Sequence, residues 1–205
     1  TWFSRAYRTG SASPGVAVSY GYLLLKSGRI DEAEKVLAAV AESTNDFDSR
    51  MSAKSNLALV LWKYGRLDDA INLLQEVFKG YRNTVVYGSL GYFYILKGDM
   101  EKAMEFNLEA YGYNSSNTII MDNLGQCYYL KGEYEKAREI YEALMLKNPP
   151  FPEAYYNYGL VLEKLGKREI ALENVKRASN YKLSFLSTIT AGDIEAKIEE
   201  LSGRG

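Results

Sequence analysis

The sequence predicts an all-α fold: a solenoid of about five helix-turn-helix repeats followed by a C-terminal capping helix. The first observation behind this prediction is a glycine followed by an alanine five residues later, a pair that occurs five times in the 205-residue chain. Successive glycines lie 37, 33, 34 and 34 residues apart, a period typical of repeat solenoids rather than of one globular core. The pairs are Gly28 and Ala33, Gly65 and Ala70, Gly98 and Ala103, Gly132 and Ala137, and Gly166 and Ala171.

The second observation is the charge pattern around each glycine. A lysine stands one or two residues before it, as in Lys26-Ser27-Gly28, and its charge complements the negative C-terminal end of a helix. Glycine accepts the left-handed backbone that ends a helix. Acidic residues such as Asp31 and Glu32 follow, and they favour the start of the next helix. Each repeat is therefore predicted to be a helix, a tight turn and a second helix.

The third observation is a small residue seven positions before each turn glycine, in the middle of the first helix. Glycine inside a helix costs about 1 kcal/mol relative to alanine. Four of the five repeats accept that cost, so we expect another helix to pass close by at this point. The five residues are Gly21, Ala58, Gly91, Gly125 and Gly159.

These positions resemble the tetratricopeptide repeat. The run Leu124-Gly125-x-x-Tyr128, followed by Gly132 and Ala137, is similar to the signature of that family. The resemblance covers residues 14–182 and implies a right-handed superhelix whose first helices line a concave groove. The chain departs from the pattern where three extra residues separate the first two repeats, near Ser43 to Asp48.

Residues 1–13 are expected to flank the first repeat. In the stretch from Thr1 to Arg8, aromatic residues precede arginines. This order fits a short amphipathic helix over the first repeat, and it also fits the cytoplasmic end of a membrane segment. Because the chain begins with threonine, we expect it to be part of a longer protein. Its expected location is the cytoplasm, with tethering to a membrane through a missing N-terminal region as an open alternative.

Residues 183–205 are expected to form a capping helix and a tail. The run from Ser187 to Thr190 is interpreted as a loop and the run from Gly192 to Leu201 as a helix with Ile194 and Ile198 on its apolar face. A terminal helix that is apolar on one side and charged on the other seals the exposed end of a solenoid. The alternative is a helix that binds another protein.

The composition argues against two classes of partner. The chain carries 25 basic and 26 acidic residues, so it lacks the basic excess that nucleic-acid binding requires. Its longest apolar stretch, from Val16 to Leu25, is far shorter than the ~20 residues of a membrane-spanning helix. We therefore expect no nucleic acid partner and no membrane insertion by this segment.

Catalytic and metal-binding motifs are missing from the sequence. There is no histidine, no glycine-rich phosphate loop, no pair of cysteines and no glycine-serine-glycine elbow. We therefore expect no enzymatic activity, no cofactor and no metal. The single cysteine, Cys127, lies beside Gly125 and is expected to be a buried packing residue.

The candidate binding site is a strip of outward-facing residues on the first helices, together with three asparagines that each follow an outward-facing residue, and is here called the first-helix strip. Exposed apolar patches mark interaction sites, and tyrosine and tryptophan are frequent binding hot spots. The resemblance also implies that asparagines in this strip hold the backbone of a bound peptide. The strip consists of Tyr22, Asn56, Leu59, Trp62, Tyr92, Ile95, Asp122, Asn123, Gln126, Tyr129, Tyr156, Asn157 and Leu160.

Val18, Leu25, Ser55 and Glu163 are expected to face the same way as the strip. Val18, Ser55, Gly88 and Asp122 stand where chaperone adaptors of the family carry basic residues, so chaperone tails are not expected ligands.

The predicted function is a protein-binding scaffold that holds a peptide or helix of a partner in its groove. Two alternatives remain open. In the first, the strip buries itself against a second copy and forms a homodimer. In the second, the chain is an accessory domain of a membrane-tethered protein.

Overall fold

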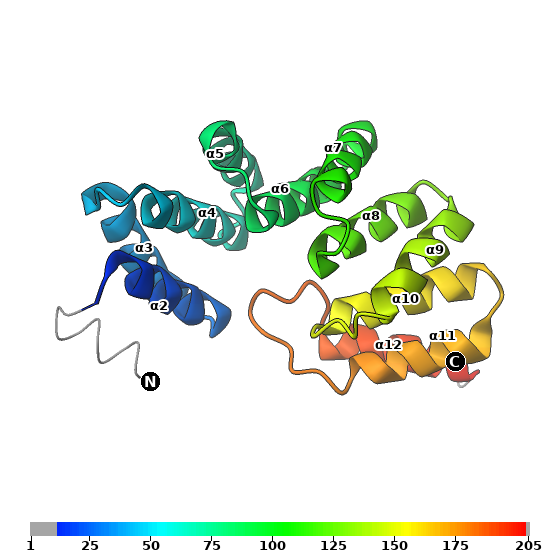
Figure 1. Ribbon diagram of the computed structural model, residues 1–205. Coiled ribbons are helices and arrows are strands. Elements are labelled where there is room, and N and C mark those ends of the chain that lie inside the picture. The colour runs from blue at the N-terminus through cyan, green and yellow to red at the C-terminus, as the bar shows by residue number, and fades with distance from the viewer. Residues whose placement is uncertain (1–11, 204–205) are drawn as a thin grey trace. The chain divides into compact units, whose positions relative to one another are not determined.

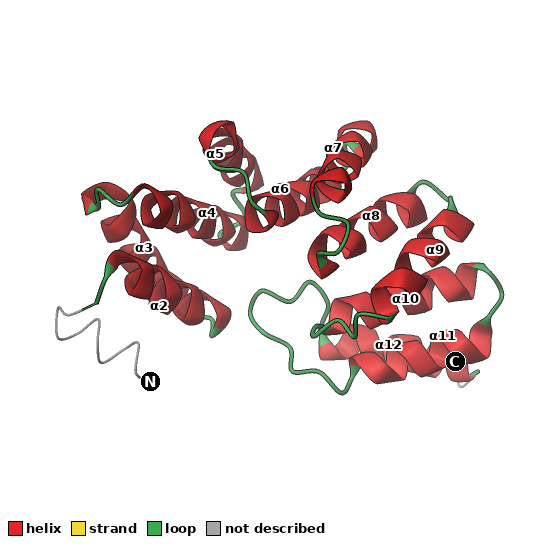
Figure 2. Cartoon of the chain, in the orientation of Figure 1, coloured by secondary structure: helices red, strands yellow, loops and turns green. Residues whose placement is uncertain are grey.

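The computed structural model describes residues 12–203, and every regular element in this range is an α-helix. Figure 1 labels the helices, and Figure 2 shows them in red, joined by loops. The helices are α2 (Pro14–Lys26), α3 (Ile30–Ser43), α4 (Phe47–Lys63), α5 (Leu67–Gly80), α6 (Thr84–Lys97), α7 (Met100–Tyr113), α8 (Thr118–Leu130), α9 (Tyr134–Met145), α10 (Pro152–Lys164), α11 (Arg168–Ala178) and α12 (Ala191–Ser202).

The ten helices from α2 to α11 form five consecutive helix-turn-helix repeats. Each turn contains the predicted glycine in a left-handed conformation, with φ between 72° and 81°. At the first turn the Gly28 N–H donates to the Leu25 carbonyl and the Arg29 N–H donates to the Leu24 carbonyl, which closes the helix end. The all-helical repeat architecture predicted from the sequence is confirmed.

The three extra residues between the first two repeats lengthen a helix rather than a loop. Helix α4 has 17 residues, whereas α2, α8 and α10 have 13 each. The Asp46 side chain accepts a hydrogen bond of 3.0 Å from the Ser49 N–H and caps the added turn. The insertion is therefore absorbed at the start of the first helix of the second repeat.

The chain divides into two compact units, and the boundary falls inside α6. Among the described residues, unit 1 comprises 12–93 together with Ser184–Leu186, and unit 2 comprises Tyr94–Leu183 together with 187–203. The sequence-based division at residues 13/14 and 182/183 stays a prediction. The expected roles of Thr1 to Arg8 lie outside the described residues.

The small residues of the first helices lie where two helices touch. A Cβ atom added to Gly21 would lie 2.6 Å from Leu37 Cγ, and one added to Gly159 would lie 2.5 Å from Val175 Cγ2. All five alanines that follow the turn glycines are fully buried. These contacts explain why the repeats accept glycine inside a helix, as the sequence predicts.

Helix α12 closes the core of unit 2, as expected. Its Ile194 and Leu201 are buried in the same apolar cluster as Tyr155 of α10. At its C-terminal end, Arg168 Nε donates a hydrogen bond of 2.7 Å to the Leu201 carbonyl. At its start, Thr190 forms a capping box with Asp193. The helix begins and ends one residue beyond the predicted bounds.

None of the helices between residues 12 and 203 is long and apolar enough to cross a membrane.

Cys127 is fully buried in α8, as expected from its place beside Gly125. Burial raises the pKa of its thiol to about 12, while a hydrogen bond from Asn107 Nδ2 opposes that shift. Because the thiolate is the reactive form, native Cys127 should resist thiol reagents at pH 8 and react after unfolding. Labelling followed by mass spectrometry checks this expectation. Stoichiometric modification of the folded chain would contradict it.

Candidate partner-binding surface

The structure places most of the first-helix strip at partly accessible positions. Tyr22 is exposed, and nine other members are half-buried. These nine are Asn56, Leu59, Trp62, Tyr92, Gln126, Tyr129, Tyr156, Asn157 and Leu160.

Three members of the strip are buried. Ile95 and Asp122 were expected to point outward, and that expectation is wrong; Asn123, which was expected to hold the backbone of a ligand, is buried as well. Ile95 is 8% exposed, Asp122 is 5% exposed and Asn123 is 2% exposed. Asp122 is enclosed by polar side chains of two other helices, and burial of the apolar Ile95 is itself favourable. Val18, Leu25 and Ser55, which were expected to face the same way, are buried as well.

In unit 1 the strip centres on Trp62 of α4. Its ring makes an edge contact with Tyr92 of α6 at a centroid distance of 5.8 Å. A second ring, Phe93, lies 5.6 Å away. The Lys63 ammonium group lies 4.0 Å from the centroid of the Trp62 ring, within cation–π range. The first helices of unit 1 therefore present ordered aromatic side chains beside a positive charge.

The other members of the strip in unit 1 have simpler surroundings. Asn56 Nδ2 donates a hydrogen bond of 3.0 Å to the Ser52 carbonyl within α4. Leu59 packs against the buried cluster formed by α2, α3 and α4. Tyr22 lies on α2 with 38% of its surface exposed.

Unit 1 also contains a surface element that no sequence pattern indicated. The segment Ser184–Leu186 precedes the expected loop, and its Phe185 N–H donates a hydrogen bond of 3.2 Å to the Lys26 carbonyl. Leu186 packs against the same buried cluster as Leu59. No local pattern marks these residues, because their contacts lie with helices that are distant in the sequence.

In unit 2 the strip centres on a buried carboxylate that holds three helices together. Asp122 Oδ1 of α8 accepts hydrogen bonds from Tyr141 Oη of α9 at 2.9 Å and from Asn157 Nδ2 of α10 at 3.1 Å. Its Oδ2 accepts a hydrogen bond of 2.9 Å from Gln126 Nε2. The donor Tyr141 lies in a second helix, outside the predicted strip.

Burial controls the protonation of this carboxylate. It raises the pKa of Asp122 to about 6, and nearby Glu153 acts in the same direction. Hydrogen bonds from Asn157, Tyr141 and Gln126 oppose the shift. Burial also raises the pKa of Tyr141 well above its ordinary value, and the Asp122 charge adds to this effect.

Two tyrosines of the strip in unit 2 lie close to helix α12. Burial raises the pKa of Tyr129 and of Tyr156, and the positive charge of Lys197 opposes both shifts. Lys197 Nζ lies 3.2 Å from Glu163 Oε2, so the charge expected at Glu163 is paired. The tyrosines therefore lie beside an ion pair rather than beside a lone carboxylate.

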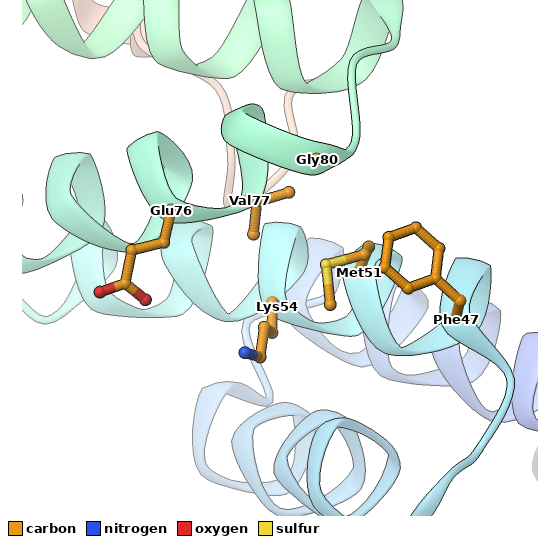
Figure 3. Close-up of a pocket in the computed structure, with 6 residues that line it drawn as sticks. All are labelled: Phe47, Met51, Lys54, Glu76, Val77 and Gly80. Carbon is orange, nitrogen blue, oxygen red and sulfur yellow. The ribbon is translucent and has the colours of Figure 1, made fainter.

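A separate hollow of about 240 Å³ lies between α4 and α5 in unit 1. Figure 3 shows that Val77 of α5 and Met51 and Phe47 of α4 form its apolar lining. Lys54 and Glu76 bring opposite charges to the same hollow, and Gly80 completes it. No member of the first-helix strip lines it, and no motif in the sequence indicated it.

Comparisons with known families cover most of the repeats. Family models described as "Tetratricopeptide repeat" match residues 19–83, 56–118, 119–151 and 152–183. No curated protein matches the chain.

Solved structures share the fold at low sequence identity. A chain of the APC/C hetero-tetramer Cut9-Hcn1 has a TM-score of 0.81 and 17% identity, over 98% of this chain and 39% of that one. A thermophilic TPR protein of Thermus thermophilus has a TM-score of 0.73 and 18% identity, over 93% and 99%. A tetratricopeptide repeat protein from Parabacteroides merdae has a TM-score of 0.62 and 14% identity, over 91% and 71%.

Proposed function

Because this chain belongs to the tetratricopeptide repeat family, we propose that it is a non-enzymatic scaffold that binds a peptide or helix of a partner protein along its first helices. Repeats of this family generally serve as protein–protein interaction modules. The observation that carries the proposal is the contact between Trp62 and Tyr92 of successive first helices. Both side chains are already half-buried, so they would lose little further conformational entropy when a ligand binds.

The polar part of the strip in unit 2 supports the same function. A carboxylate only accepts hydrogen bonds, so Gln126 and Asn157 both direct their NH₂ groups at Asp122. Their carbonyl oxygens consequently point away from the carboxylate and can accept hydrogen bonds from a ligand. We propose that this face holds backbone N–H groups or donor side chains of the partner.

Selection from a random peptide library on the immobilised chain tests the aromatic anchors. We expect Trp62→Ala to weaken the selected peptides roughly thirtyfold, because truncating a binding hot spot costs about 2 kcal/mol or more. Tyr113→Ala is the matched control, since Tyr113 is an exposed aromatic residue on the second helix α7. Isothermal titration calorimetry measures the affinities, after circular dichroism has verified the helical content of each variant.

Two outcomes would contradict the proposal. Equal affinities of the selected peptides for Trp62→Ala and for the native chain would mean that Trp62 does not anchor the ligand. A change from dimer to monomer in Trp62→Ala, seen by light scattering, would instead assign the surface to self-association. The cytoplasmic location stays a prediction, which fractionation of the source cell checks.

A further inference from the structure

A three-residue segment of the chain lies against the ends of two first helices in unit 1. Ser184–Leu186 belongs to the connection between α11 and α12, and it is part of unit 1. The Phe185 N–H donates its hydrogen bond of 3.2 Å to the Lys26 carbonyl, at the last residue of α2. The last carbonyls of a helix have no partner within the helix, so the segment satisfies a group that would otherwise need water.

The Phe185 ring lies at the turn between α2 and α3. The nearest ring carbon is 3.6 Å from the position that a Cβ atom on Gly28 would take. The Lys63 ammonium group is 5.2 Å from the centroid of the Phe185 ring and 4.0 Å from that of Trp62. One cation therefore contacts both the segment and the central aromatic residue of the strip in unit 1.

The segment is only partly buried. Phe185 keeps 40% of its surface exposed. Leu186 is half-buried against the apolar cluster of unit 1, and its N–H donates a hydrogen bond to Ser184 Oγ within the segment. Partly buried connections between helices belong to the less stable parts of a fold, which open locally without global unfolding.

We infer that Lys26, Gly28 and Lys63 form a docking seat for an aromatic residue followed by an aliphatic one, and that Phe185–Leu186 is its built-in occupant. This inference rests on the proposed function and adds a ligand class to it. A partner segment of the same chemistry would donate its backbone N–H to the Lys26 carbonyl and place its ring beneath the Lys63 ammonium. It could do so only after Phe185–Leu186 leaves the seat.

A synthetic peptide that copies residues 182–190 serves as the probe. It carries a fluorescent label and is titrated into the whole native chain, into a Phe185→Ala, Leu186→Ala double variant and into Leu146→Ala. Leu146 is a matched control, because it is an exposed leucine in another connection. Circular dichroism verifies that each variant keeps its helical content.

We expect saturable binding to the double variant. Binding to the native chain and to Leu146→Ala should be roughly tenfold weaker or more, because an occupied seat lowers the apparent affinity by the fraction that is open. The same peptide with alanine in place of phenylalanine should not bind. Chemical shift changes in the double variant should include the amides of Gly28 and Lys63.

Equal affinity of the peptide for the native chain and for the double variant would overturn the inference. A peptide that binds neither chain would overturn it as well. Both results leave the library selection with Trp62→Ala as a separate test of the proposed function. The peptide could also bind the double variant as expected while no library peptide depends on Trp62. That result would support the docking seat and contradict the proposed binding surface along the first helices.

Discussion

Replacement of Gly125 by leucine is expected to lower the free energy of unfolding by about 1–3 kcal/mol or more, because the new side chain overpacks a closed helix contact. A Cβ atom at this position would lie 2.5 Å from Cε2 and 2.8 Å from Cζ of Tyr141. Tyr141 is fully buried and donates its hydroxyl to Asp122, so it cannot move without breaking that hydrogen bond. Urea denaturation followed by circular dichroism measures the change.

The matched control for this substitution is Gly112→Leu. Gly112 lies in α7, and a Cβ atom added there would meet nothing within 4 Å. Leucine has a higher helix propensity than glycine by about 1 kcal/mol or less, so we expect this variant to match or exceed native stability. Equal denaturation midpoints for the two variants would mean that Gly125 is not enclosed by Tyr141.

The second expected result is a pH-dependent contribution of Asp122 to stability. Its pKa is about 6 in the folded chain against an ordinary value of 3.8, so the folded chain binds the extra proton more tightly than the unfolded chain. This stabilisation is fully present below about pH 4 and is lost as the pH rises through about 6. Integrated over the complete titration of the folded and unfolded chain, the loss is on the order of 3 kcal/mol.

The Asp122→Asn variant isolates this contribution, because asparagine has a similar shape and does not titrate. The difference in unfolding free energy between the native chain and the variant should change by about 2 kcal/mol between pH 4 and pH 7, because the rest of the change lies below pH 4. The same comparison with Glu139→Gln is the control for the loss of a carboxylate, since Glu139 is an exposed residue of α9. An NMR titration that follows the carboxyl carbon of Asp122 and gives a pKa near 3.8 would contradict the prediction.

The repeat fold could be predicted because its signals are local. Gly28 and Gly132 adopt the left-handed conformation that the turn after each first helix requires. This requirement depends only on the backbone of the turn itself. Gly125 marks a helix contact because any larger residue there would collide with Tyr141. The period between these positions needed no knowledge of distant contacts.

The candidate site could be predicted only in part. Trp62 and Tyr92 are partly accessible on neighbouring first helices, as predicted from their helical spacing relative to the small mid-helix residue. The same helical spacing predicted that Asp122 is accessible. That prediction is wrong, because Asn157 and Tyr141 of other helices cover the Asp122 side chain. Whether a residue on a helix face meets solvent or a neighbour depends on the partner helix.

The sequence by itself determined the helices, their turns and the repeat period of this chain, because helix ends and tight turns depend on interactions within a few residues. Only the tertiary structure decided that Asp122 is a buried hydrogen-bond acceptor with a raised pKa. It alone also decided that Phe185 lies against the end of α2. Both features arise where segments distant in the sequence meet, and burial and desolvation at such contacts leave no local pattern in the residues that form them.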